Sequence, residues 1–222
     1  MRDTQTVNLT IDVISDVVCP WCYIGKRRLE AALAKLAASQ PELRPRVSWH
    51  PFELNPDMPP EGVDRREYVR QKFGDGERAR AIYERLVGVG DQVGLALAFD
   101  AIRRQPNTRD AHRLIAWGQG LGDADALVER LFRAFFMEGC DIGDRAALAA
   151  LAGEAGYDAV AARAYLASDE GRELVEAASR RARELGVNGV PFFIFENKVA
   201  VSGAQESDTL LEAIAEARRK AA

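Results

Sequence analysis

The stretch SDVVCPWCYIGKRRLEAAL, Ser15–Leu33, places two of the three cysteines of the chain between an apolar run and a helical pattern. Upstream, VNLTIDVI over residues 7–14 alternates polar residues with apolar, mostly β-branched ones, which predicts a strand. Downstream, apolar residues recur at helical spacing until Pro41, where a helix cannot continue. Cys19 and Cys22 therefore stand where a strand gives way to a helix.

The rest of the chain divides into three parts. A second strand is predicted over 46–54, and the Pro- and Gly-rich run NPDMPPEG over 55–62 marks an exit from regular structure. From 64 to 185 the sequence shows only helical patterns. After Gly186, the β-rich runs PFFIF and KVAVSG, separated by EN, predict a hairpin over 191–203, and a helix follows it.

The predicted order of elements is therefore β-α-β, a helical insertion, then β-β-α. Together the outer pieces predict one mixed sheet of four strands flanked by helices, which is an α/β fold. The domain boundaries follow from this order. Residues 1–62 and 186–222 form the outer domain, and residues 63–185 form an all-helical inserted subdomain.

Composition and charge exclude several classes of protein. The 222 residues are 47% hydrophobic, which is enough to bury a core. The formal net charge is −4 and basic residues are scattered among acidic ones, so we expect no nucleic-acid partner. The first residues lack the apolar region of a signal peptide, and no run reaches the length of a membrane span. We expect a soluble, cytoplasmic protein without a membrane partner.

The spacing of the cysteine pair predicts redox chemistry. A thiolate, and not a thiol, carries out disulfide exchange. The unpaired N–H groups at a helix N-terminus favour a negative charge, and Pro20 suits the first helical position after Cys19. Cys22 lies three residues on, along the same helical face, close enough to attack a mixed disulfide on Cys19. Cys19 is thus the predicted nucleophile and Cys22 the resolving thiol.

Two other roles for the pair are less well supported by the sequence. A zinc site needs four ligands, and the remaining candidates, Cys140, His50 and His112, show no second paired spacing. We therefore expect no bound metal. A purely structural disulfide between residues so close in the chain would remove little chain entropy from the unfolded state.

The second notable motif is GVPFFIF, in which Pro191 opens a predicted strand. Proline cannot donate a hydrogen bond to the ladder there, so it is either a trans proline at a strand edge or a cis proline. The residues alone leave these two alternatives open.

These motifs together resemble the DsbA family of thioredoxin-fold oxidoreductases. The shared features are a CPWC motif at a strand–helix junction, a helical insertion, and a late GVP before a hairpin and a terminal helix. Five segments in order, covering nearly the whole chain, resemble the cytoplasmic FrnE-like subgroup: ISDVVCPWCYIGKRRLEAAL, WHPFELNPDMPPEG, PNTRDAHRLIAWG, LFRAFFMEGCDIGD and GVNGVPFFIFENKVAVSGAQ. That subgroup is related to 2-hydroxychromene-2-carboxylate isomerases and kappa-class glutathione transferases. The resemblance implies a thioredoxin-like fold with a large helical insertion.

The resemblance also implies roles for particular residues. Cys19 and Cys22 become the redox pair of a thiol-disulfide oxidoreductase that reduces, forms or isomerises disulfides in polypeptides. Val190-Pro191 becomes a cis-proline loop beside the pair, whose backbone can pair with an extended peptide. Pro20 and Trp21, inside the motif, are predicted to contact the substrate.

An alternative function follows from the isomerase and transferase relatives, which usually place serine where this chain has Cys19 and use it to orient glutathione. The alternative is a glutathione-dependent isomerase or transferase acting on an aromatic small molecule. Ser202 aligns with the region that holds glutathione, although Gln205 replaces an expected acidic residue. We expect no tightly bound cofactor, with glutathione as a candidate co-substrate, and the kinship is compatible with a homodimer.

Two single residues have more than one interpretation. His112 falls on a predicted helix, where it either packs or caps within the helical part or lines a pocket near the cysteines. Cys140 is interpreted as a small buried apolar residue and not as a third redox centre.

Overall fold

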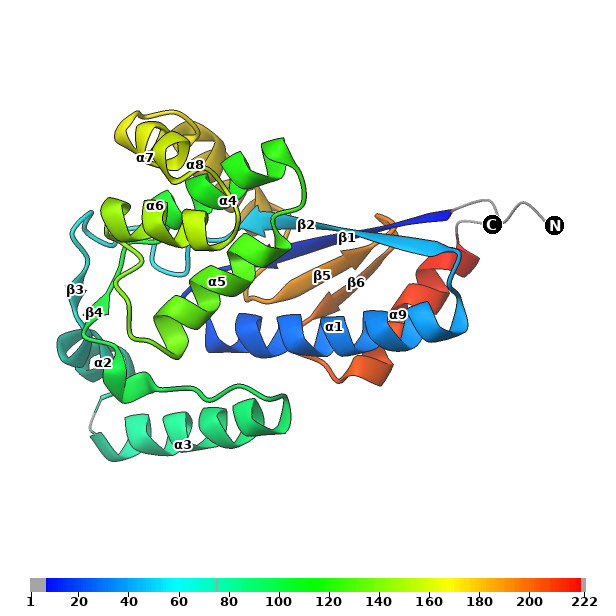
Figure 1. Ribbon diagram of the computed structural model, residues 1–222. Coiled ribbons are helices and arrows are strands. Elements are labelled where there is room, and N and C mark those ends of the chain that lie inside the picture. Colours follow the sequence, from blue (N-terminus) through cyan, green and yellow to red (C-terminus); the bar gives the residue numbers. More distant parts are fainter. Residues whose placement is uncertain (1–6, 75, 221–222) are drawn as a thin grey trace.

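The computed structural model describes residues 7–74 and 76–220. At its centre lies a four-stranded sheet with the strand order β2-β1-β5-β6 (Figure 1). Strand β1 pairs in parallel with β2 and antiparallel with β5, and β5 pairs antiparallel with β6. The predicted mixed sheet is thus confirmed. The strands are β1 (Val7–Ser15), β2 (Leu43–Pro51), β5 (Phe192–Phe195) and β6 (Val199–Ser202).

Two helices of the outer part, α1 and α9, lie side by side along the sheet, and the other helices gather at the end where β1 stops (Figure 1). The α/β, thioredoxin-like fold class with a helical insertion is confirmed. The helices are α1 (Pro20–Ser39), α2 (Arg65–Phe73), α3 (Gly76–Gln92), α4 (Arg109–Leu121), α5 (Asp125–Phe136), α6 (Arg145–Glu154), α7 (Ala159–Ala167), α8 (Arg172–Glu184) and α9 (Ser207–Arg219), with a 3₁₀ turn, η1, at Phe99–Ala101.

Strand β2 begins and ends three residues earlier than predicted. Phe52 N still donates to Ser15 O of β1, but Glu53 and Leu54 leave the sheet because their backbone N–H groups have other partners. Glu53 N donates to Ser179 Oγ in α8 at 2.9 Å. Leu54 N donates to Asp16 Oδ2 at 2.8 Å. The chain therefore bends towards the insertion directly beyond the last strand residue, Pro51.

The insertion contains one element that helical patterning cannot show. Strands β3 (Val63–Asp64) and β4 (Arg104–Gln105) form a two-stranded antiparallel ladder, so the prediction of helices alone over this part was wrong at that point. Two-residue strands are too short for any periodicity to register. Gly62, with φ of 68°, precedes the ladder, and a Cβ there would lie 2.5 Å from the Gln105 carbonyl oxygen. The glycine permits this close approach.

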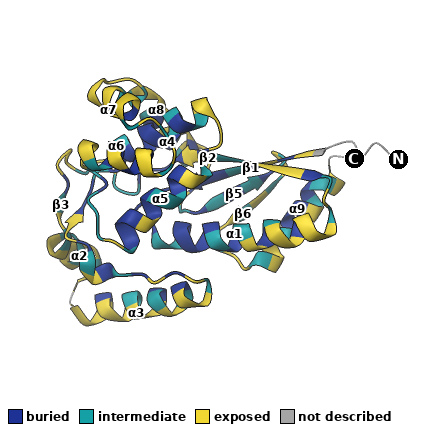
Figure 2. Ribbon diagram, viewed as in Figure 1, coloured by how far each residue is buried: buried dark blue, intermediate teal, exposed yellow. Residues whose placement is uncertain are grey.

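The sheet and the insertion share one continuous hydrophobic core. Tyr23 in α1 stacks on Phe132 and Phe136 of α5, with ring centroids 5.0 and 6.2 Å apart. Phe136 in turn meets Phe99 edge-on at 6.0 Å. Figure 2 shows this buried band running from α1 into α5. The division of the chain at residues 62 and 186 stays a prediction, because the core is continuous across it.

The hairpin between β5 and β6 confirms the predicted turn. Glu196 and Asn197 connect the two strands with φ of 52° and 54°. Two consecutive left-handed residues form the turn that two-residue hairpins favour, since its twist matches that of the strands.

The outer edge of β2 is covered at one point by a side chain. Gln119 of α4 accepts a hydrogen bond from Trp49 N at 2.6 Å and donates one to Trp49 O at 2.9 Å. Its amide thus pairs with the edge strand as a neighbouring strand would. In the described part of the chain, every helix is too short or too polar to cross a membrane.

Candidate active site

Cys19 occupies the N-cap position of α1, and Pro20 follows it at the first helical position. Only 5% of Cys19 is exposed, and its thiol donates a hydrogen bond to the Val190 carbonyl oxygen, with the two atoms 3.5 Å apart. The sulfur makes no capping hydrogen bond with the helix. A protonated thiol is a donor and Val190 O is an acceptor within reach, which accounts for this orientation.

Cys22 lies one turn further into the helix and is 1% exposed. Burial raises the pKa of its thiol well above the ordinary range, and the neighbouring Cys19 raises the pKa further. The Ser15 hydroxyl and the Asp16 backbone act in the opposite direction. Both cysteines are free thiols in this structure. The two sulfurs therefore differ: Cys19 is at the helix end, and Cys22 is a protonated, buried thiol behind it.

The Val190-Pro191 peptide bond is cis. Pro191 is buried against α1, where a Cβ on Gly25 would come within 2.8 Å of the proline ring. On its other side, the Pro191 carbonyl accepts a hydrogen bond from Gly203 N at 2.8 Å. The loop is thus held between α1 and the end of β6, with the Val190 carbonyl directed at Cys19.

A buried acid and a histidine lie beneath the cysteine pair. Asp16 is completely buried directly after β1, and its backbone carbonyl accepts a hydrogen bond from Cys19 N at 3.0 Å. Its carboxylate lies 3.3 Å from His112 Nε2 of α4, a residue that is only 4% exposed. The same carboxylate accepts the hydrogen bond from Leu54 N. Asp16 therefore joins the cysteine turn, α4 and the chain beyond β2.

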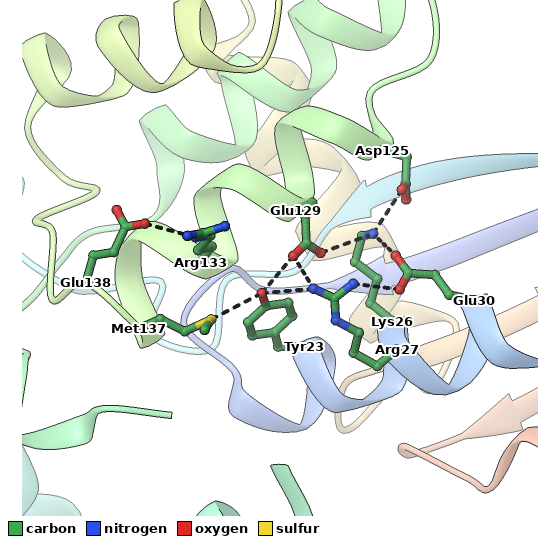
Figure 3. Close-up of polar contacts among 9 residues, drawn as sticks. All are labelled: Tyr23, Lys26, Arg27, Glu30, Asp125, Glu129, Arg133, Met137 and Glu138. Carbon is green, nitrogen blue, oxygen red and sulfur yellow. Dashed lines mark hydrogen bonds and ion pairs between the residues drawn. The ribbon is translucent and has the colours of Figure 1, made fainter. Parts of the chain in front are cut away.

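A cluster of charged side chains joins α1 to α5 (Figure 3). Lys26, whose side chain is 1% exposed, is 2.9 Å from Asp125 and 3.3 Å from Glu129, both of α5, and also pairs with Glu30. Burial alone would lower the pKa of Lys26, but the carboxylates of Asp125 and Glu30 raise it overall. Tyr23 donates a hydrogen bond to Glu129 at 2.8 Å. The cluster fixes α1 to α5 directly after the cysteine turn.

The model of the DSBA-like thioredoxin domain matches residues 10–215 of this chain. The chain belongs to the DsbA-like thioredoxin family. Its fold, its cis proline and its cysteine pair agree with that membership, and the sequence-based assignment to the DsbA family is confirmed.

Solved structures agree with this assignment. A probable DsbA oxidoreductase from Streptomyces coelicolor is 32% identical with a TM-score of 0.84, over 95% of this chain and 90% of that one. A 2-hydroxychromene-2-carboxylate isomerase shares the fold at 19% identity, with a TM-score of 0.69 over 96% and 97% of the two chains. The cytosolic disulfide reductase DsbM from Pseudomonas aeruginosa, solved with GSH, shares it at 19% identity, with a TM-score of 0.57 over 96% of each chain.

The other predicted substrate-contacting residues of this DsbA-like chain lie at different depths. Pro20 and Trp21 are half-buried at the start of α1, and Val190 is half-buried beside Cys19. Ser202 is exposed at the end of β6, opposite Phe192 in the ladder, and its carbonyl accepts a hydrogen bond from Gln205 Nε2 at 2.9 Å. The structure brings Val190 and Pro191 to the cysteines, and the roles of all these residues stay predictions.

His112 lies within the site but beneath its surface. It is buried and, together with Ser15 and Trp49, lines a small cavity; both interpretations of its role stay predictions. Asp16 and Ser15 were missed by the sequence analysis. The sequence does contain a signal for Ser15 and Asp16, because they form a polar pair between an apolar strand and the cysteine motif. Over residues 7–74 and 76–220, we find no group of three or more metal-ligating side chains that could hold a metal ion.

Proposed function

We propose that this protein is a thiol-disulfide oxidoreductase of the FrnE-like subgroup that acts on disulfides of polypeptides through Cys19 and Cys22. The observation that carries the proposal is the arrangement of Cys19 at a helix N-terminus, facing the carbonyl of a cis-proline loop, with a second thiol one turn away. Family membership supports it. A cytoplasmic location, where thiols stay reduced, belongs to the same proposal.

The proposed reaction proceeds in two exchanges. The Cys19 thiolate attacks one sulfur of a substrate disulfide, so that a Cys19–substrate bond forms, the substrate disulfide breaks, and the leaving thiolate takes up a proton. Cys22 then loses its proton and attacks Cys19. This forms the Cys19–Cys22 disulfide and releases the second substrate thiol. The substrate gains two electrons and the cysteine pair loses two, and the reverse sequence oxidises a dithiol substrate.

Glutathione is the proposed small-molecule thiol partner that returns the pair to its starting state. The glutathione-bound state of DsbM motivates this part of the proposal. In this chain Cys19 stands where the isomerase relatives carry serine, so the first step is disulfide exchange and not orientation of a bound thiol. A glutathione-dependent isomerase is the alternative against which the experiment is designed.

The experiment compares the wild type with the Cys19→Ser and Cys22→Ser variants. We expect the wild type to reduce insulin and to reactivate scrambled ribonuclease, and Cys19→Ser to do neither, because serine cannot form the mixed disulfide. Cys22→Ser should accumulate covalent adducts on Cys19, and mass spectrometry of these adducts identifies the substrate class. If the wild type and Cys19→Ser behave alike in both assays, the proposal is wrong. If Cys19→Ser retains turnover of an aromatic substrate with glutathione, the isomerase alternative is correct.

A further inference from the structure

A cleft of about 640 Å³ lies between α2, α3 and the η1 turn, within the size range of clefts that bind ligands. Its lining carries an excess of positive charge, because four arginines face it against one acidic residue, Asp100. The four are Arg65, Arg66, Arg70 and Arg103. The chain as a whole has a formal net charge of −4, so this excess is local and does not follow from the composition. We call this site the arginine cleft.

Arg65 is the least exposed of these arginines, and its described partners are all neutral. Its guanidinium donates hydrogen bonds to Tyr83 Oη at 2.9 Å and to Gln105 Oε1. It also lies 5.6 and 5.7 Å from the ring centroids of Tyr68 and Tyr83. Burial lowers the pKa of Arg65. A half-buried cation surrounded by neutral groups is costly, and an anion in the cleft would supply the missing counter-charge.

Two further arginines of the cleft are available to a ligand. Arg66 and Arg103 are exposed, and neither forms an ion pair with any residue in 7–74 or 76–220. Arg145, which lines a smaller cleft elsewhere, is instead held 2.6 Å from Asp110. Guanidinium groups bind carboxylates through two parallel hydrogen bonds. The arginine cleft therefore has unused capacity for carboxylates, whereas the smaller cleft is neutralised from within.

The floor of the arginine cleft is apolar and aromatic. Tyr83 of α3 stacks on the buried Phe99 of η1, with ring centroids 4.5 Å apart, and the buried Ile102 lies beside them in the lining. The arginines come from two segments, α2 and the chain after η1. Several cations distributed over an apolar floor suit a ligand with several negative charges and apolar groups between them. An acidic segment of a polypeptide has this chemistry.

The cleft lies close to the cysteine turn through a short series of packed rings. Phe99 of the floor meets Phe136 edge-on at 6.0 Å, and Phe136 stacks with Tyr23 at 6.2 Å. Tyr23 directly follows the cysteine motif, and α3 also contacts α1. An extended polypeptide advances about 3.3 Å per residue, so a segment of about eight residues is long enough to lie both in the cleft and at Cys19.

We propose that the arginine cleft binds an acidic segment of the polypeptide whose disulfide the Cys19–Cys22 pair exchanges. This inference rests on the proposed function and names its substrate class. Carboxylates of the segment pair with Arg65, Arg66 and Arg103, and its apolar side chains lie on the aromatic floor. Binding of the segment raises the effective concentration of the attached disulfide at Cys19. The chemistry of the exchange itself is unchanged.

The test uses two synthetic peptides of equal length, each with one cysteine held in a mixed disulfide with the neutral 2-thiopyridine. Four glutamates in one peptide, or four glutamines in the other, begin about six residues from that cysteine. The Cys19 thiolate attacks the peptide sulfur, so that a Cys19–peptide disulfide forms and 2-thiopyridone leaves. Absorbance of the released thiopyridone gives the second-order rate constant. It is measured at about 20 mM and about 500 mM salt, where charges are weakly and strongly screened.

The wild type is compared with two cleft variants and one matched control. Arg65→Gln removes the half-buried cation, and the double variant Arg66→Glu/Arg103→Glu reverses two exposed charges. The control, Arg163→Glu/Arg180→Glu, makes the same change of net charge at exposed arginines of α7 and α8. Those helices lie on the opposite side of the insertion from α2 and α3 (Figure 1). Near-UV circular dichroism first establishes that each variant is folded.

We expect the wild type to react about tenfold faster with the glutamate peptide than with the glutamine peptide at low salt. The ratio of the two rates should fall towards one at high salt, because screening weakens the ion pairs. Arg66→Glu/Arg103→Glu should lower the low-salt ratio below about twofold, and Arg65→Gln should lower it about threefold or more. The control variant should keep most of the wild-type ratio, because its charges lie away from the cleft.

Each outcome decides one of the two proposals. If the wild type releases thiopyridone from neither peptide, the proposed function is contradicted. If it reacts with both at equal rates, the function stands and the inference is overturned. An equal loss of preference in Arg66→Glu/Arg103→Glu and in the control would assign the preference to net charge, which also overturns the inference. Saturable binding of a mononucleotide such as AMP, together with equal peptide rates, would assign the cleft to a small anion instead. Should Arg65→Gln not fold, the double variant decides, because both of its side chains are exposed.

Discussion

Two polar clusters lie next to the Cys19–Cys22 turn, one after it in α1 and one before it at Asp16, and they are built in opposite ways. On the α5 side, Lys26 is surrounded by three carboxylates, and each charged group there has a partner of opposite sign. On the α4 side, Asp16 and His112 share one contact at 3.3 Å, next to a small cavity that Ser15 and Trp49 help to line. The first cluster is saturated with ion pairs, whereas the second is a single contact between an acid and a histidine.

The difference between the clusters indicates what each does. Ion pairs that satisfy one another hold two helices together but have no capacity left to exchange a proton. Asp16 instead uses one carboxylate oxygen for His112 and the other for Leu54 N. The saturated side therefore fixes the position of α1 against α5, and the α4 side joins the cysteine turn to α4.

The largest expected effect comes from breaking the saturated cluster. Lys26→Met should lower the free energy of unfolding by about 3 kcal/mol, because three partly exposed carboxylates lose the buried cation that they share. Lys35→Met is the control on the same helix. The Lys35 side chain is 52% exposed and pairs with an exposed Asp208, so its loss should cost at most about 1 kcal/mol. Urea unfolding of both variants measures the difference. Equal stabilities would show that the Lys26 cluster does not hold α1 to α5.

The contact between α1 and the cis-proline loop should show the next largest effect. Gly25→Ala places a Cβ 2.8 Å from the Pro191 ring and 3.2 Å from Phe193, so we expect destabilisation of about 1–3 kcal/mol from overpacking. Gly88→Ala in α3, where nothing lies within 4 Å, should instead stabilise the protein by about 1 kcal/mol through helix propensity. Thermal unfolding of the two variants gives the comparison. A stabilised Gly25→Ala variant would mean that the loop moves freely away from α1.

The buried thiol predicts a pH dependence of stability. Because the folded pKa of Cys22 is raised, the folded state keeps its proton after the unfolded thiol ionises near pH 8.5. Stability is thus full below about pH 8.5, and above it the reduced protein should lose about 1.4 kcal/mol for each pH unit up to the folded pKa. Urea midpoints between pH 7 and 10 measure the slope, and Cys22→Ala should reduce it. The same slope in both proteins would assign the effect to other groups.

The smallest effect is expected at the exposed end of β6. Ser202→Ala should change the unfolding free energy by at most about 0.5 kcal/mol, since the side chain is on the surface and its backbone carbonyl makes the observed contact. Both steps of thiol exchange should also stay within about twofold of the wild type. A large loss of exchange with glutathione, but not with peptide disulfides, would instead assign Ser202 to glutathione binding.

The fold could be predicted largely from local patterns. Alternation over 7–14, helical spacing up to Pro41 and the EN turn each determine structure over a few residues, and each is found where the sequence predicts it. The β3–β4 ladder could not be predicted in this way, because two-residue strands carry no period. The end of β2 was displaced by hydrogen bonds from Glu53 and Leu54 to residues distant in sequence.

The candidate site, like the fold, could be predicted only where local sequence patterns determine it. Residue type and spacing were enough to identify Cys19, Cys22 and Pro191 as candidate site residues. The structure brings the three together. The Asp16–His112 pair joins residues 96 positions apart, and only the packing of α4 against the end of β1 creates it. Lys26 belongs to the run KRR, whose composition is typical of a solvated helix face, yet α5 covers it. Long-range burial of polar groups is the part that local patterns leave undetermined.

The outer edge of β2 limits how other chains can add to the sheet. The residues whose backbone groups face outwards alternate along the strand, and two of them, Pro45 and Pro51, have no N–H to offer. The Leu43 N–H donates a hydrogen bond to the Gln40 carbonyl, and the Trp49 N–H donates one to the side-chain amide oxygen of Gln119. Along this described edge, the backbone N–H of Val47 is the one outward-facing donor without a partner. A strand from another chain could therefore form almost no hydrogen bonds with this edge. This edge is thereby protected against the edge-to-edge pairing through which sheets aggregate.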